Sequence, residues 1–268
     1  MADDDPVWDG RGGDPWLPDR VAALLDAARA EARLFREFLA HLRRWLGLVR
    51  ERVRESGYDA TAIAALIPAW RDAMSDFAEG PILETMRQGY RGVTGEDFTV
   101  DAEQAALNRA WSRRNQLVGV GDEVYVLVQR EIATALRDGL PGPDLADRID
   151  DVLDATATPR WTNRAAVIAR TETIGALNGG RADGQATMAR RLGGDFERVW
   201  IATRDSRTRP SHVLADGQRV PLGSMFTVGG AQLRWPGDPL GPPGEVIQCR
   251  CTTILVRPGQ NIDIARRA

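Results

Sequence analysis

The stretch that decides the fold covers residues 17–56 and reads LPDRVAALLDAARAEARLFREFLAHLRRWLGLVRERVRES. Apolar residues recur in it at alternating spacings of four and three, which is the heptad pattern of a coiled coil or a helical bundle. We therefore expect one long helix whose apolar seam packs on a partner helix or within the chain's own bundle. The seam consists of Val21, Leu25, Ala28, Ala32, Phe35, Leu39, Leu42, Leu46, Val49 and Val53. The residues predicted to bind a partner are Val21, Leu25, Phe35, Leu39, Leu42 and Leu46.

Composition limits the class of protein. The chain has 268 residues, of which 43% are hydrophobic and 27% charged, so it can bury an ordinary globular core. Its net charge of −3 argues against a generally basic nucleic-acid binder. All 35 basic residues are arginine, which we interpret as a genomic bias because no mechanism requires the complete absence of lysine.

Targeting signals are not evident in the sequence. The acidic start of the chain has neither a basic nor an apolar segment of the kind found in signal peptides. No apolar run reaches the roughly 18 residues of a transmembrane helix. We therefore expect a protein that is made in the cytoplasm and has no membrane partner.

The chain divides into four parts. Residues 1–16 are predicted to be a flexible arm, 17–157 a helical region, 158–258 a mixed module and 259–268 a tail. The helical region is expected to be a bundle built around the long helix. This organisation predicts an α+β fold, mostly helical in its N-terminal two-thirds and mixed α/β with short antiparallel strands towards its C-terminus.

Glycine and proline suggest breaks within the helical region. A short helix is expected after residues 80–81, and the glycines at 119–121 are expected to separate two helices. A threonine followed by Pro159 predicts a helix from there to Leu192, weakened in its middle by the glycines at 179–180. Beyond it, β-type runs at 196–203, 218–221, 225–228 and 246–256 alternate with turn residues.

A set of short motifs follows in a fixed order near the C-terminus. They are Arg170-Thr171-Glu172, Trp200, Asp205-Ser-Arg207-Thr-Arg209-Pro-Ser-His212, Asp216-Gly217, Pro236-Gly-Asp238-Pro239 and Gln248-Cys249-Arg250-Cys251. This ordered set resembles the phage Mu F-like minor capsid, or phage head morphogenesis, family, most strongly from residue 160 onward. One departure is Gln248, where that family often has asparagine.

The resemblance implies a structural protein of a tailed-phage virion. Its expected partners are the portal protein and other capsid proteins, with possible contact to packaged DNA, and its expected location is the interior of the head. We predict no enzymatic activity. The alternative is a nuclease or toxin-like domain that uses Arg207, Arg209 and His212, and a metal-stapled DNA-binding module ranks third.

The two cysteines raise the question of a metal. Residues two apart on a strand face the same side, so Cys249 and Cys251 would lie together. With His212 and Asp205 they could ligate zinc, although Cys-x-Cys departs from the usual Cys-x₂₋₄-Cys spacing. A pair of buried reduced cysteines is the preferred interpretation, and no cofactor is predicted.

The polar motif residues are predicted to form a structural network rather than a catalytic site. Asp205 would accept backbone N–H bonds in its turn, and Arg207 or Arg209 would pair with Glu172. Arg170 and Glu172 would each reach the β module. The network is assigned to Arg170, Glu172, Asp205, Arg207, Arg209, His212, Asp216 and Asp238, and Trp161, Trp200 and Trp235 are expected in the core.

Overall fold

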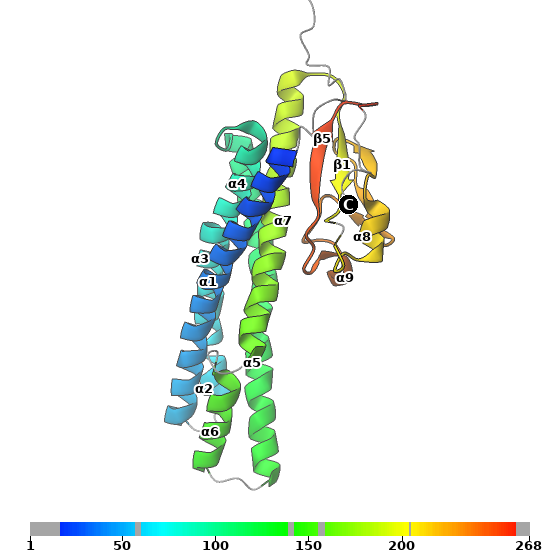
Figure 1. The fold of residues 1–268 in the computed structure, drawn as a ribbon. Coiled ribbons are helices and arrows are strands. Elements are labelled where there is room, and N and C mark those ends of the chain that lie inside the picture. Colours follow the sequence, from blue (N-terminus) through cyan, green and yellow to red (C-terminus); the bar gives the residue numbers. More distant parts are fainter. Residues whose placement is uncertain (1–16, 57–59, 139–141, 155–158, 204, 261–268) are drawn as a thin grey trace, which may run out of the picture.

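The structure is a computed structural model that describes residues 17–56, 60–138, 142–154, 159–203 and 205–260. It consists of an elongated bundle of helices and a small module of short strands and helices (Figure 1). The α+β fold predicted from the sequence is therefore confirmed. The predicted arm and most of the predicted tail lie outside the described residues.

Helix α1 (Leu17–Ser56) has the bounds that its heptad pattern predicts. Its buried stripe, however, follows the predicted seam only from Leu39 onward. Ala28 and Ala32 are exposed, whereas Ala30 and Leu34 are buried. The buried residues Ala30, Leu34 and Phe38 are each four residues apart, whereas a heptad alternates spacings of three and four. A different face of the helix therefore points to the core in this part.

Four of the six predicted partner-binding residues belong instead to this chain's own core. Leu39, Leu42 and Leu46 are buried against the other helices, and Phe35 is half-buried against the same cluster. Their assignment to a partner is therefore wrong, because intramolecular packing already covers them. The side chains of Val21 and Leu25 lie outside the described residues.

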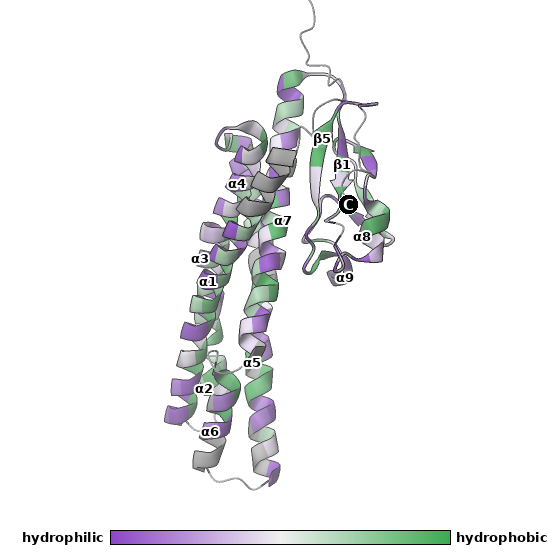
Figure 2. Ribbon diagram, viewed as in Figure 1, coloured by the Kyte–Doolittle hydropathy of each residue, from purple (hydrophilic) through white to green (hydrophobic). Residues whose placement is uncertain are grey.

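The other bundle elements follow in chain order. They are α2 (Ala60–Ala64), α3 (Ile67–Phe77), the π-helical segment η1 (Ala78–Ile82), α4 (Leu83–Thr94), α5 (Val100–Asp138), α6 (Gly142–Leu153) and α7 (Pro159–Leu192). The break expected at residues 80–81 does not occur, because the wider π turn of η1 carries the helix through Pro81. Both hydrophilic and hydrophobic residues occur along α1, α5 and α7 (Figure 2). None of the described helices has an apolar stretch long enough to cross a membrane.

The expected break between two helices at residues 119–121 is also absent, since α5 is continuous. Gly121 provides room for the indole of Trp70: a Cβ atom there would lie 2.6 Å from Trp70 Cδ1. The indole Nε1 of Trp70 donates a hydrogen bond to the Leu117 carbonyl at 3.2 Å. Glycine thus serves side-chain packing here rather than helix termination.

Glycines also bring α4 and α7 unusually close together. A Cβ on Gly180 would lie 1.8 Å from the Met86 carbonyl oxygen, and one on Gly89 would lie 2.1 Å from the Leu177 carbonyl oxygen. α7 is continuous through residues 179–180, so these glycines do not interrupt it. They let two helix backbones approach where any side chain would separate them.

The C-terminal module contains β1 (Glu197–Ile201), α8 (Pro210–Ala215), β2 (Arg219–Pro221), β3 (Phe226–Val228), β4 (Ala231–Leu233), α9 (Pro243–Val246) and β5 (Thr252–Val256). β1 lies between β2 and β5 in an antiparallel sheet, and β3 and β4 form a hairpin. The run predicted at 246–256 is a strand only from Thr252, because α9 and a turn precede it. Trp161, Trp200 and Trp235 are buried, as predicted.

The module lies beside the C-terminal half of α7, while α1, α3 and α4 lie on the other side of that helix (Figure 1). Asn178 joins the two parts, because its side-chain amide donates to the carbonyls of Pro236 at 3.0 Å and Cys251 at 2.9 Å. The guanidinium of Arg181 donates to the Thr252 hydroxyl at 2.7 Å. α7 is therefore both a core helix of the bundle and the support of the module.

Candidate functional site in the C-terminal module

His212 is the centre of the densest group of reactive side chains. Helix α8 begins with Pro210, which favours the first turn of a helix, and turns His212 inward so that only 2% of the residue is exposed. The imidazole packs edge-on against the indole of Trp200 at a centroid distance of 5.6 Å. Its Nδ1 lies 3.3 Å from Cys251 Sγ and 3.7 Å from Cys249 Sγ.

The two cysteines lie in the turn between α9 and β5, whereas the sequence suggested that they lie on a strand. Gln248, immediately before them, has a left-handed backbone with φ of 59°. The Cys251 amide donates to Cys249 Sγ at 3.5 Å, and this hydrogen bond stabilises the turn. The contact between the thiols lowers the pKa of Cys249, whereas that contact and burial raise the pKa of Cys251.

Asp205 does not join the cysteines and is not a ligand candidate. Its carboxylate forms an ion pair with Arg250 and accepts a hydrogen bond from the Arg207 amide at 3.0 Å, as predicted for a turn. The Arg250 guanidinium holds the pKa of this carboxyl well below its usual range. Among the described residues, the group placed to hold a metal consists of His212, Cys249 and Cys251 alone.

Arg207, Arg209 and His212 do not share a site. Arg207 has a side chain 70% exposed and lies 3.7 Å from Asp205. Arg209 donates to the Ile247 carbonyl, whereas the buried His212 contacts Cys251 and Glu245. Their partners therefore differ from the predicted pairing with Glu172, and the geometry gives no support to the nuclease arrangement.

The remaining motif residues have structural partners. Arg170 pairs with Glu31 of α1 at 2.7 Å, so its predicted reach to the β module is wrong; α1 packs on this side of α7. Glu172 is buried. The Asp216 carboxylate accepts from the Ala202 amide at 2.8 Å.

Asp238, also buried, closes a turn rather than a reactive site. It accepts from the Arg234 guanidinium at 2.5 and 2.9 Å and from the amides of Arg234 and Leu240. These bonds lower its pKa against the opposing effect of burial, which is the larger single influence. The carboxylate therefore remains charged and fully engaged.

Sequence reasoning missed Glu245, which completes the environment of His212. Its carboxylate lies 3.1 Å from His212 Nε2 and accepts from the Ser211 hydroxyl at 2.8 Å. The run Gly-Pro-Pro-Gly-Glu predicts a turn but gives no sign of this contact. Asn178, which holds the Cys251 carbonyl, was missed too; an asparagine beside two glycines within a helix was the available signal.

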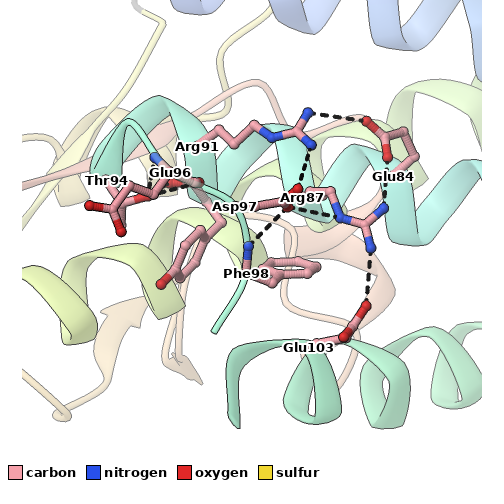
Figure 3. A network of polar contacts seen from close by, with 9 residues as sticks. Glu84, Arg87, Arg91, Thr94, Glu96, Asp97, Phe98 and Glu103 are labelled. Carbon is pink, nitrogen blue, oxygen red and sulfur yellow. Dashed lines mark hydrogen bonds and ion pairs between the residues drawn. The ribbon is translucent and has the colours of Figure 1, made fainter. Parts of the chain in front are cut away.

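A second polar cluster joins the end of α4 to the start of α5 (Figure 3). Arg87 reaches Glu84 at 3.0 Å, Asp97 at 3.1 Å and Glu103 at 3.1 Å. Arg91 pairs with Asp97 at 2.9 Å. Its charges are paired with one another, so this cluster fixes the connection between two helices and has no unsatisfied group directed at a ligand.

Comparison with known proteins assigns the region around this site. Residues 127–254 match the family described as phage Mu protein F like protein. This segment is phage Mu protein F-like. The match confirms the resemblance of the C-terminal motifs and begins within α5, so the family segment includes α6 and α7 as well as most of the module.

One curated relative has a different description. The chain is 32% identical over 143 residues to the NAD(+)--arginine ADP-ribosyltransferase EFV of Enterococcus faecalis, covering 52% of this chain and 27% of that protein. The chain thus spans about a quarter of the length of that relative. No solved structure matches the chain.

Proposed function

We propose that this chain is a minor structural protein of a tailed-phage head, associated with the portal and the interior of the head, and that it acts in head assembly or in DNA packaging and delivery. The observation that supports this most is the phage Mu protein F-like segment at residues 127–254. That segment includes α7, which carries the module, together with the module itself up to β5. Because α7 holds the module in a fixed position on the bundle, the module can be presented to other proteins of an assembly.

The geometry of the module favours this proposal over a nuclease. His212 is buried, and neither Arg207 nor Arg209 is directed at it. A general base must reach the proton that it abstracts, either directly or through one water molecule. We therefore expect no nuclease activity, with or without His212.

The relationship to an ADP-ribosyltransferase leads to a separate test. Because the match covers only 27% of that relative, we propose that the two proteins share a structural part and that this chain transfers no ADP-ribose. Incubation with NAD⁺ and a small guanidino acceptor should consume no more NAD⁺ than heat-denatured protein does. Transfer of ADP-ribose to the acceptor would contradict the proposal.

Complex formation with the portal protein of the same phage is the central test. The full chain, co-expressed with that portal, should co-elute with it in size-exclusion chromatography and give a defined mass by light scattering. The portal of an unrelated phage serves as the control. Deleting α1 is unsuitable because its seam is in the core. A folded chain that fails to bind its own portal, and that mass spectrometry does not find in purified heads, would refute the proposal.

Point variants on the surface can then locate the contact. Leu214 of α8 is 86% exposed and Leu192 at the end of α7 is 57% exposed, so glutamate at either position should leave the fold intact. Since both leucines lie on or beside the family segment's module, loss of portal binding in Leu214→Glu alone would place the interface at α8. Loss in Leu192→Glu alone would place it at the end of α7.

A further inference from the structure

Three side chains with affinity for soft metals converge within the module. The donor atoms of His212, Cys249 and Cys251 all lie within 4.8 Å of one another, and each of the three residues is at most 3% exposed. They come from two segments, helix α8 and the turn before β5. Imidazole and thiolate are the ligands that zinc prefers in proteins.

The spacing of these atoms fits tetrahedral zinc. Zinc–sulfur bonds of about 2.3 Å and zinc–nitrogen bonds of about 2.0–2.1 Å place a nitrogen and a sulfur ligand about 3.6 Å apart at the tetrahedral angle. The distances from His212 Nδ1 to the two sulfurs are 3.3 and 3.7 Å. The turn of Gln248 brings the sulfurs together, so the Cys-x-Cys spacing is no obstacle.

The surroundings of His212 orient it as a ligand. With Glu245 accepting from Nε2, the lone pair of Nδ1 faces the two sulfurs. A carboxylate behind the ligating histidine is the usual support of such sites. Glu245 is itself held by Ser211, and the β3–β4 turn abuts it: a Cβ on Gly229 would lie 2.2 Å from Glu245 Oε1.

Charge also favours a divalent ion at this position. Two thiolates and a neutral imidazole balance the charge of Zn²⁺, so the ligated unit is neutral and suits a buried place. The Cys251 amide donates to Cys249 Sγ, which stabilises a thiolate.

We propose that His212, Cys249 and Cys251 bind one Zn²⁺ ion that joins α8 to the turn before β5, with a water molecule as the fourth ligand. Glu245 is a positioning residue for His212. The ion stabilises the module whether or not the chain binds a portal, so this inference and the proposed function can fail separately. Binding releases the two thiol protons to solvent.

The test measures metal in the full chain, purified without a histidine tag and under reducing conditions after growth with zinc. Mass spectrometry of the metal should give about one equivalent per chain. Cobalt in place of zinc should give the near-ultraviolet absorption of thiolate-to-metal charge transfer. Cys251→Ser and His212→Ala should lose both signals, whereas Asp205→Asn, a matched control outside the ligand set, should keep them. Glu245→Gln should keep one equivalent but bind about 10–100 times more weakly.

Removal of the ion from the unaltered protein avoids variants that fail to fold. A zinc chelator should lower the melting temperature by about 5 °C or more, and added zinc should restore it. The chelator should leave the melting temperature of Cys251→Ser unchanged. Folded wild-type protein with two titratable thiols that takes up less than about a tenth of an equivalent of zinc would overturn the proposal.

Discussion

Substitution of Gly180 by alanine should destabilise the protein even though alanine favours helices. The new Cβ would lie 1.8 Å from the Met86 carbonyl oxygen and 3.0 Å from the Tyr90 amide nitrogen. Since ordinary contact begins at 3.4 Å, α4 and α7 would have to separate by about 1.6 Å, the difference between 3.4 and 1.8 Å. A gap of 0.5–1 Å already forfeits about a quarter to a half of each contact's dispersion energy.

The magnitude follows from two opposing effects. Overpacking costs about 1–3 kcal/mol, and a clash with rigid backbone belongs at or above the upper end of that range. Helix propensity returns about 1 kcal/mol. We therefore expect Gly180→Ala to lower the free energy of unfolding by about 2 kcal/mol, which corresponds to a fall of about 4–8 °C in the melting temperature.

The matched control is Gly92→Ala on α4, where a Cβ meets no atom within 4 Å. This exposed helical position should gain about 0.5–1 kcal/mol from the same substitution. Urea denaturation followed by circular dichroism measures both variants, with the slope of the transition as a check on two-state behaviour. If Gly180→Ala were as stable as Gly92→Ala, the close crossing of α4 and α7 would be refuted.

Three further predictions concern polar contacts. Arg109 grips Asp183 at 2.5 and 2.6 Å, and burial raises the pKa of Asp183 to about 6 although Arg109 opposes this. The folded state therefore holds more protons than the unfolded state between about pH 4 and 6, so stability falls as the pH rises through that window. In Arg109→Met the fall should extend above pH 6, with a loss of about 2–3 kcal/mol at pH 7 that adding Asp183→Asn partly restores. Unchanged midpoints of urea denaturation would contradict this prediction. Asn178→Ala removes the donor of the Pro236 and Cys251 carbonyls, so we expect the free energy of unfolding to fall by about 1–3 kcal/mol and proteolysis between α7 and β1 to be faster. Equal cleavage rates would show that Asn178 does not hold the module on α7. Arg250→Met should return the depressed pKa of Asp205 towards about 3.9, so the stability that Asp205 contributes above that pH and loses on acidification should disappear. Carbon NMR titration of the carboxyl group measures this pKa, and an unmoved pKa would refute the pairing.

The long helices were predictable because periodicity and capping residues act locally. α1 and α7 begin and end where the sequence predicted, at residues 17–56 and 159–192. The glycines were misjudged because their role depends on another helix. Gly121 faces Trp70, and Gly180 faces the backbone of α4, neither of which is a neighbour in sequence.

The candidate site was predictable in its members but not in its geometry. The sequence predicted that Cys249 and Cys251 lie together, but on a strand; in the structure they come together in a turn that follows the left-handed Gln248. Glu245 could not be identified, because its contact with His212 joins α9 to α8 through tertiary packing. Asp205 was assigned to the wrong group since an ion pair with Arg250 competes for it.

The continuity of α7 has a mechanical consequence. Its 34 residues form an unbroken rod about 50 Å long, and the same turns, at residues 177–185, pack against α4 on one face and hold the module on another. Because both contacts lie on these turns, a displacement of α4 is passed to the module across the helix and not along its length. A partner that fixes the bundle therefore also fixes the orientation of the module, and a force on the module acts first on the glycine contacts between α4 and α7.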